Sequence, residues 1–404
     1  MLVTLGVVSI AAGAAQAAGR ASFEEFDRRA KAGERLNIVF FGASLTWGAN
    51  ATDPPLTSYR GQLARRMEVA YPLARLKFHD AAIGGTGSQL GIFRLDRDVL
   101  ARKPDLVFLD FSANDDISSA DPETLASYEA LVRRLITDAG CPVVQVLFPF
   151  LWDVKSANFA AMKRRTAHLA IADAYHTAAG DAIALAVQRV KDGQTTLEKL
   201  WPVDGVHPCD EGYTLFADAA WAAFQDAVAR KLVCVAPPKM LHADTYMKSA
   251  RIHLTTLGPL PAGWRAGRPN LTSAFFDMLM SRWLDDEVIA TGAKPERLKV
   301  TFRGSMVMLF GEGTPKSGHF RAYVDGKLVE HLEGKAAKTE WNAAHIAGPA
   351  RGNAHLIVRI AQGLDPAVEH TLEIEPAFEG PDQELRLESI CVAGSDAPNV
   401  RRPR

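Results

Sequence analysis

Apolar runs alternate with amphipathic stretches between residues 36 and 234. A short continuous apolar run is typical of a strand that is covered on both faces of a parallel sheet. Such runs span 36–41, 76–82, 105–111 and 142–150. The stretches between them have apolar residues at helical spacing, and further helices are predicted at 157–179 and 212–231. Strands that alternate with helices predict an α/β domain over residues 36–234.

The pattern changes at Pro237 and Pro238. Beyond residue 297, apolar and polar residues alternate along short segments that are separated by Gly, Pro and Asp. This alternation predicts an antiparallel β-sandwich, which we assign to residues 240–396. Asp325-Gly326 predicts a two-residue hairpin turn within it. Residues 240–296 have a mixed pattern that predicts no particular element.

The first residues form an uncharged apolar stretch that ends in the small residues around Ala17. The stretch is too short to span a bilayer comfortably, and its ending is typical of a secretory signal peptide. We interpret residues 1–18 as such a peptide, which predicts a secreted or periplasmic protein with no membrane span after cleavage near Ala17. A hydrophobic anchor or a truncated start is the alternative, because no Lys or Arg precedes the apolar stretch.

Charge and cysteine content exclude several classes of function. The chain of 404 residues has 46 basic and 47 acidic residues, so no net field attracts nucleic acid or an anionic membrane. Its four cysteines, Cys141, Cys209, Cys234 and Cys391, are scattered without the spacing of a zinc site, and no metal or cofactor is predicted. We expect free thiols, with Cys209 and Cys234 as the pair to test for a disulfide.

A lone serine follows the first predicted strand, in the stretch FFGASLTWG at residues 40–48. Function in a parallel sheet gathers beyond the carboxyl ends of the strands, where Ser44 lies. A serine hydroxyl needs a base to become a nucleophile, and His207 is the best placed of the 11 histidines. Asp204 precedes it in a turn rich in Pro and Gly, so its carboxylate can orient the imidazole.

Acyl transfer also needs hydrogen-bond donors for the oxyanion that develops on the substrate. Candidates follow the second and third predicted strands. They are the backbone NH groups of Gly84 and Gly85 and the side-chain amide of Asn114.

Four motifs in this order resemble the SGNH subgroup of the GDSL hydrolases. They are Gly42-Ala43-Ser44-Leu45, Gly85, Asn114-Asp115 and Asp204-Gly205-Val206-His207, and the resemblance covers about residues 36–232. It implies a flavodoxin-like three-layer α/β/α fold with Ser44 as nucleophile, His207 as base and Asp204 as its orienter. It also implies an oxyanion hole made by the NH groups of Ser44 and Gly85 and the amide of Asn114. Ala43 stands where the family has its name-giving aspartate, which puts the hydrogen bonding of this turn in doubt.

Plainer interpretations remain open for each residue. Ser44 could be no more than a helix cap, Asn114 could be no more than part of a turn, and His207 could be a surface histidine without a catalytic role. Trp47 and Tyr59 lie close to Ser44 in sequence, where they could contact a sugar ring or an acyl chain. Alternatively, they could have only a structural place in the wall of the site or in the core.

The sequence around Ser44 resembles that of exported SGNH enzymes that deacetylate polysaccharides. The second domain resembles the jelly-roll accessory domains of carbohydrate esterases. The resemblance implies a serine esterase that removes short acyl groups, acetyl above all, from an acylated carbohydrate. The alternatives are a lipase, lysophospholipase or thioesterase that acts on longer chains, an acyltransferase, and a glycan-binding protein without catalysis.

Overall fold

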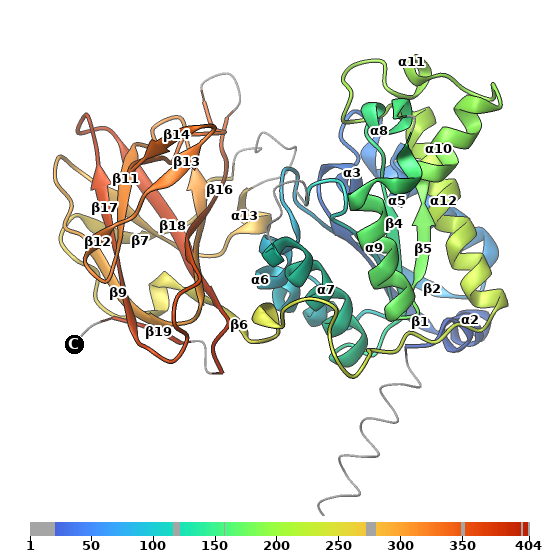
Figure 1. Cartoon of the computed structure of the whole chain (residues 1–404), viewed down its shortest axis with the longest axis horizontal. Coiled ribbons are helices and arrows are strands. Elements are labelled where there is room, and N and C mark those ends of the chain that lie inside the picture. Colours follow the sequence, from blue (N-terminus) through green and yellow to red (C-terminus); the bar gives the residue numbers. More distant parts are fainter. Residues whose placement is uncertain are drawn as a thin grey trace, which may run out of the picture. The chain divides into compact units, whose positions relative to one another are not determined.

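The computed structural model describes residues 21–115, 122–156, 158–271, 280–348, 352–396 and 399–402. The chain divides into two compact units, Met1–Ala243 and Asp244–Arg404 (Figure 1). The predicted signal peptide, 1–18, lies outside the described residues. Within the described ranges, no helix combines the length and the apolar character that a bilayer crossing needs.

The first unit is built on a parallel sheet of five strands in the order β2-β1-β3-β4-β5, which is the flavodoxin-like order. The four strands predicted from apolar runs are present, so the predicted α/β fold is confirmed. The strands are β1 (Arg35–Gly42), β2 (Arg75–Ala82), β3 (Leu106–Asp110), β4 (Val143–Leu147) and β5 (Ala178–Asp181).

Helices cover both faces of this sheet (Figure 1). Because successive side chains of a strand point to opposite faces, neighbouring residues of β1 meet different helices. The ring of Phe40 packs edge-on against Tyr59, with centroids 5.8 Å apart, whereas Phe41 lies under the guanidinium of Arg94. The helices of this unit are α2 (Phe23–Lys31), α3 (Ser44–Trp47), α4 (Pro54–Thr57), α5 (Tyr59–Ala70), α6 (Ser88–Asp98), α7 (Pro122–Thr137), α8 (Leu151–Lys155), α9 (Lys163–Ala174), α10 (Ala182–Lys191), α11 (Leu197–Leu200) and α12 (Asp210–Ala229).

One predicted helix is wrong in extent. The stretch 157–179 contains α9, but its last two residues belong to β5. Helix α10, which follows β5, was not predicted, and Ala157 lies outside the described residues. The sequence of β5, Ala-Ala-Gly-Asp, has no β-branched residue, and its alanines favour helix. Pairing with β4 therefore overrides the local preference.

The end of the first unit is anchored by a buried carboxylate. Glu129 of α7 accepts hydrogen bonds from the backbone NH groups of Leu241 and His242, each at 2.7 Å, and from the hydroxyl of Tyr175. Residues 240–243, which we assigned to the second domain, therefore belong to the first unit.

The second unit is a β-sandwich, as predicted. One sheet has the order β16-β10-β18-β8-β7 with β6 paired to β18, and the other has the order β12-β11-β17-β9-β19 with β15 paired to β11. Residues 240–296, for which the sequence predicted no particular element, contribute β6, β7 and β8. The elements are β6 (Ser249–His253), β7 (Trp264–Gly267), α13 (Met280–Trp283), β8 (Glu287–Thr291), β9 (Leu298–Arg303), β10 (Met306–Gly313), β11 (His319–Val324), β12 (Lys327–Leu328), β13 (His331–Glu333), β14 (Ala336–Lys338), β15 (Trp341–Asn342), β16 (Ala354–Gln362), β17 (His370–Ala377), β18 (Glu384–Ala393) and β19 (Asn399–Arg401).

The predicted hairpin turn joins β11 to β12. Asp325 and Gly326 have φ angles of 51° and 75°, the left-handed pair that a two-residue hairpin with the right twist requires. The prediction from the Asp-Gly dipeptide is confirmed.

All four cysteines are free thiols. The thiol of Cys209 donates a hydrogen bond to the carbonyl of Lys199, and burial raises the pKa of the Cys234 thiol to about 12. The pair that we singled out is therefore not joined in this structure.

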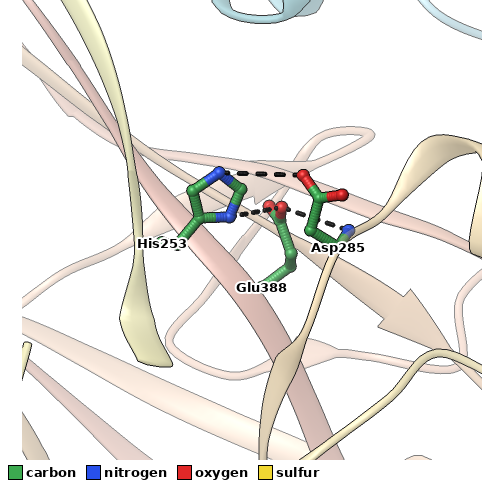
Figure 2. A group of neighbouring side chains, drawn as sticks. All are labelled: His253, Asp285 and Glu388. Carbon is green, nitrogen blue, oxygen red and sulfur yellow. Dashed lines mark hydrogen bonds and ion pairs between the residues drawn. The ribbon is translucent and has the colours of Figure 1, made fainter. Parts of the chain in front are cut away.

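A charged cluster lies in the sandwich where β6 meets β18 (Figure 2). Glu388 is fully buried and accepts hydrogen bonds at 2.7 Å from Nη2 of Arg251 and at 2.8 Å from Nδ1 of His253. The other ring nitrogen of His253 faces Asp285 at 3.7 Å. Burial opposes ionisation of Glu388, but His253 and Arg251 lower its pKa to about 2.

His253, Asp285 and Glu388 bring potential metal ligands within 4.8 Å of one another. However, Arg251 binds both oxygens of Glu388, through Nη2 and Nε. A divalent cation on Glu388 would lie beside this guanidinium, and the two positive charges would repel each other. The donor set therefore suits a charge-balanced ion-pair cluster with protonated His253 better than a metal.

The hydrogen bond to Glu388 raises the pKa of His253, against the effect of burial. A raised folded-state pKa gives stability that is fully present below the unfolded pKa and is lost as pH rises through the folded value. We therefore expect His253→Gln to lower the melting temperature of the protein more at about pH 6 than at about pH 8. Calorimetric scans of both proteins at the two pH values check this. An equal difference at both would contradict it.

Candidate active site

The turn that presents Ser44 depends on Gly42 at the end of β1. A Cβ on Gly42 would lie 2.2 Å from Oγ1 of Thr46 and 2.5 Å from the carbonyl oxygen of Asp110. Only glycine lets the chain turn this closely over β3 into α3. Ser44 is the first residue of α3, after the N-cap Ala43, so helix capping does not explain its hydroxyl.

The structure brings Ser44, His207 and Asp204 together. The Ser44 hydroxyl donates to Nε2 of His207 over 3.0 Å, and Nδ1–H of His207 donates to Oδ2 of Asp204 over 3.3 Å. Ser44 has 5 % of its surface exposed, whereas His207 and Asp204 lie in a more open turn. The arrangement can pass a proton from a serine hydroxyl to an imidazole that a carboxylate orients.

Asp204 is held as a carboxylate. Its Oδ1 accepts from the NH groups of Val206 and His207, each at 2.7 Å, and its Oδ2 accepts from the side-chain amide of Asn50 at 3.0 Å. Burial raises the pKa of Asp204, but these hydrogen bonds and the nearby His207 outweigh it and leave the pKa below its usual value. An ionised Asp204 suits an imidazole that becomes positively charged.

The loop after α3 is tied to the first turn of α12 by further hydrogen bonds. Thr52 donates through its NH and hydroxyl to Asp210, and the hydroxyl of Tyr213 donates to the carbonyl of Ala49 over 2.6 Å. Asp210 therefore helps to fix the loop that follows Ser44. Sequence reasoning also missed Asn50, whose φ of 66° is a conformation that asparagine tolerates well.

The candidate oxyanion donors follow the two strands that flank β1. Gly85 has a φ of 70° in the turn between β2 and α6, and Asn114 lies in the turn after β3. Buried Asp115 joins these two turns, because it accepts a hydrogen bond from the NH of Ser88 over 2.8 Å. Ser44, Gly85 and Asn114 thus come from the same edge of three adjacent strands. Their part in an oxyanion hole stays a prediction.

Arg94 supplies hydrogen bonds to the turn that lacks the usual aspartate. It is fully buried in α6 and donates to the carbonyls of Gly42 and Ala81 over 2.9 and 2.6 Å. These carbonyls end or nearly end β1 and β2, so one guanidinium holds together the two strand ends that precede Ser44 and Gly85. Ala43 is buried and offers no side-chain hydrogen bond to this turn, and Arg94, which only donates, does not replace the acceptor oxygens of a carboxylate.

The two aromatic candidates for substrate contact differ. Tyr59 is fully buried, and the centroid of its ring lies 4.9 Å from that of Phe148. Of the two alternatives for Tyr59, substrate contact or core packing, the structure therefore shows core packing. Tyr59 is the first residue of α5, and its ring also packs against Phe40 of β1, which explains this placement. Trp47 is half-buried at the end of α3, and its contact with a substrate stays a prediction.

The first unit thus combines a flavodoxin-like parallel sheet with Ser44, His207 and Asp204 linked by hydrogen bonds at its carboxyl edge. Residues 40–215 match the model of the GDSL-like lipase/acylhydrolase family. This match lies within the first unit and supports the resemblance there. No curated protein matches the chain.

Solved structures resemble the chain over both units. A two-domain esterase (CEX) active on acetylated mannans, crystallised with mannopentaose, matches with a TM-score of 0.75 and 22% identity over 94% of this chain and 98% of that one. A second structure of a two-domain esterase (CEX) active on acetylated mannans matches with a TM-score of 0.72 and 22% identity, over 94% and 99%. A catalytic mutant of the acetylxylan esterase Axe2 from Geobacillus stearothermophilus matches with a TM-score of 0.39 and 20% identity, over 47% of this chain and 94% of that one. At 22% identity the CEX match shows the fold.

The amide of Asn50 is expected to position Asp204 for catalysis. Asn50→Gly removes this amide but still permits the φ of 66°, so it is a cleaner test than Asn50→Ala. We expect kcat for an aryl acetate to fall about 10-fold, the usual size of a supporting hydrogen bond's effect. Steady-state kinetics beside a melting curve would check this. Wild-type kcat in a folded Asn50→Gly protein would contradict the role.

Proposed function

We propose that the protein is a serine esterase that hydrolyses short acyl esters, acetyl above all, on carbohydrate. The observation that carries the proposal is the 3.0 Å hydrogen bond from Ser44 to His207, whose far nitrogen faces Asp204. A serine with this company is an activated nucleophile.

In the proposed reaction His207 takes the proton of Ser44 through Nε2 while Oγ attacks the ester carbonyl. The NH groups of Ser44 and Gly85 and the amide of Asn114 donate to the oxyanion that forms. His207 then gives the proton to the leaving sugar hydroxyl, and an acetyl-enzyme remains. Water, deprotonated by His207, attacks this ester and releases acetate together with the free Ser44 hydroxyl.

A carbohydrate substrate is supported by two facts. The CEX structures come from an esterase active on acetylated mannans, and its fold extends over 94% of this chain. The formal charge of the chain is −1, which suits a neutral glycan better than an anionic lipid surface. The apolar N-terminal stretch, residues 1–18, further supports export to the place where polysaccharides are met.

The proposal predicts acetate release from acetylated mannan and a preference for acetyl over octanoyl aryl esters. The physical reason is that an octanoyl chain gains binding energy only where a long apolar surface buries it, which hydrolysis of a sugar acetate does not require. Enzymatic quantification of acetate and a chain-length series of 4-nitrophenyl esters would measure both. A preference for octanoyl esters would favour the lipase or thioesterase alternative instead.

The control for this experiment is Ser44→Ala beside Ser156→Ala, which changes an exposed serine in a loop after α8. The first variant should lose at least about 10³-fold in kcat while its melting temperature stays close to that of the wild type. The second should keep full activity. Glycan binding without hydrolysis by the wild type would support the non-catalytic alternative.

A further inference from the structure

Trp152 is an exposed aromatic residue close to the proposed catalytic loop. All seven tryptophans lie in the described part of the chain, and Trp152, with 53 % of its surface exposed, is the one that is classed as exposed. It follows β4, on the short helix α8. An exposed indole offers a ligand a large flat apolar surface.

The indole lies directly against the loop that carries Asp204 and His207. A Cβ on Gly205 would come within 3.0 Å of Cζ3 and 3.3 Å of Cε3 of Trp152. The NH of Leu151 also donates to the carbonyl of Gly205 over 2.9 Å. Because Gly205 lies between the proposed orienter and the proposed base, Trp152 lies against the loop of the proposed reaction site.

Several contacts hold the segment that carries Trp152 in place. The ring of Phe150 packs against the indole, with centroids 4.8 Å apart, and the NH of Phe150 donates to Asp153 over 2.7 Å. Asp153 is buried and pairs with Arg164, whose guanidinium also lies over the ring of Phe150. A rigidly held aromatic surface loses little entropy when it binds a ligand.

We propose that Trp152 forms a sugar-binding subsite, in which the indole packs against the apolar face of a pyranose ring of the glycan. The proposal rests on the proposed function and adds a specificity determinant to it. A pyranose has an apolar C–H face that covers an exposed aromatic surface, while its hydroxyl groups stay in water. The short acetyl group of an aryl acetate would not need this surface.

The test compares kcat/KM on acetylated mannan with kcat/KM on 4-nitrophenyl acetate for Trp152→Ala, Trp152→Phe and Trp152→Leu in the full chain. We expect the ratio of mannan to aryl acetate to fall about 10-fold for Trp152→Ala, mainly through KM. Trp152→Phe should keep most of the ratio because it keeps a flat ring. Trp152→Leu should resemble Trp152→Ala, since it fills space beside Gly205 without a flat face. Val69→Ala, at an exposed position of α5, is the control that should leave the ratio unchanged.

A direct measurement separates binding from turnover. In a Ser44→Ala background, calorimetric titration with mannopentaose should show weaker binding when Trp152→Ala is added. An unchanged ratio with unchanged binding would overturn the subsite, as would equal losses on mannan and aryl acetate, which indicate a purely structural role. A selective loss on octanoyl esters would also overturn it, since the indole would then contact an acyl chain. Failure of the wild type to hydrolyse any ester would instead refute the proposed function itself.

Discussion

The hydrogen bond between Ser44 and His207 is the contact on which the rest of the site depends, because it joins residues 163 positions apart. It exists only if two loops at the carboxyl edge of the sheet keep a fixed spacing. Hydrogen bonds between residues 49–52 and 204–213 provide that spacing. The proposed base is therefore positioned before a substrate arrives, which is the condition under which proximity lowers a barrier.

The sheet imposes the second constraint. Its order places β1 between β2 and β3, so the loops after three neighbouring strands meet at one edge. Arg94 joins the ends of β1 and β2. Asp115, which follows β3, binds the start of α6, which follows β2. The buried polar groups of the first unit thus hold the loops that carry the proposed nucleophile and oxyanion donors.

Sequence alone predicts those parts of the molecule whose cause is local. Strands β1 to β4 have continuous apolar runs, and the motifs around Ser44 and His207 are short and contiguous. β5 could not be predicted, because its alanines and glycine form a strand only through pairing with β4. Arg94 and Trp152 carry no local signal either, since their importance comes from contacts with segments far away in the sequence. In the second unit the alternation predicts the sandwich, but β6 to β8 lack a clear pattern.

Ser44 is the proposed nucleophile of an acyl-enzyme mechanism. The most direct measurement is peptide mapping by mass spectrometry after reaction with a fluorophosphonate, which reacts covalently with activated serines. The account predicts a single adduct on Ser44, whose formation parallels the loss of esterase activity and is strongly slowed by His207→Gln. Full inactivation with the adduct on another residue, or retained activity with Ser44 fully labelled, would contradict it.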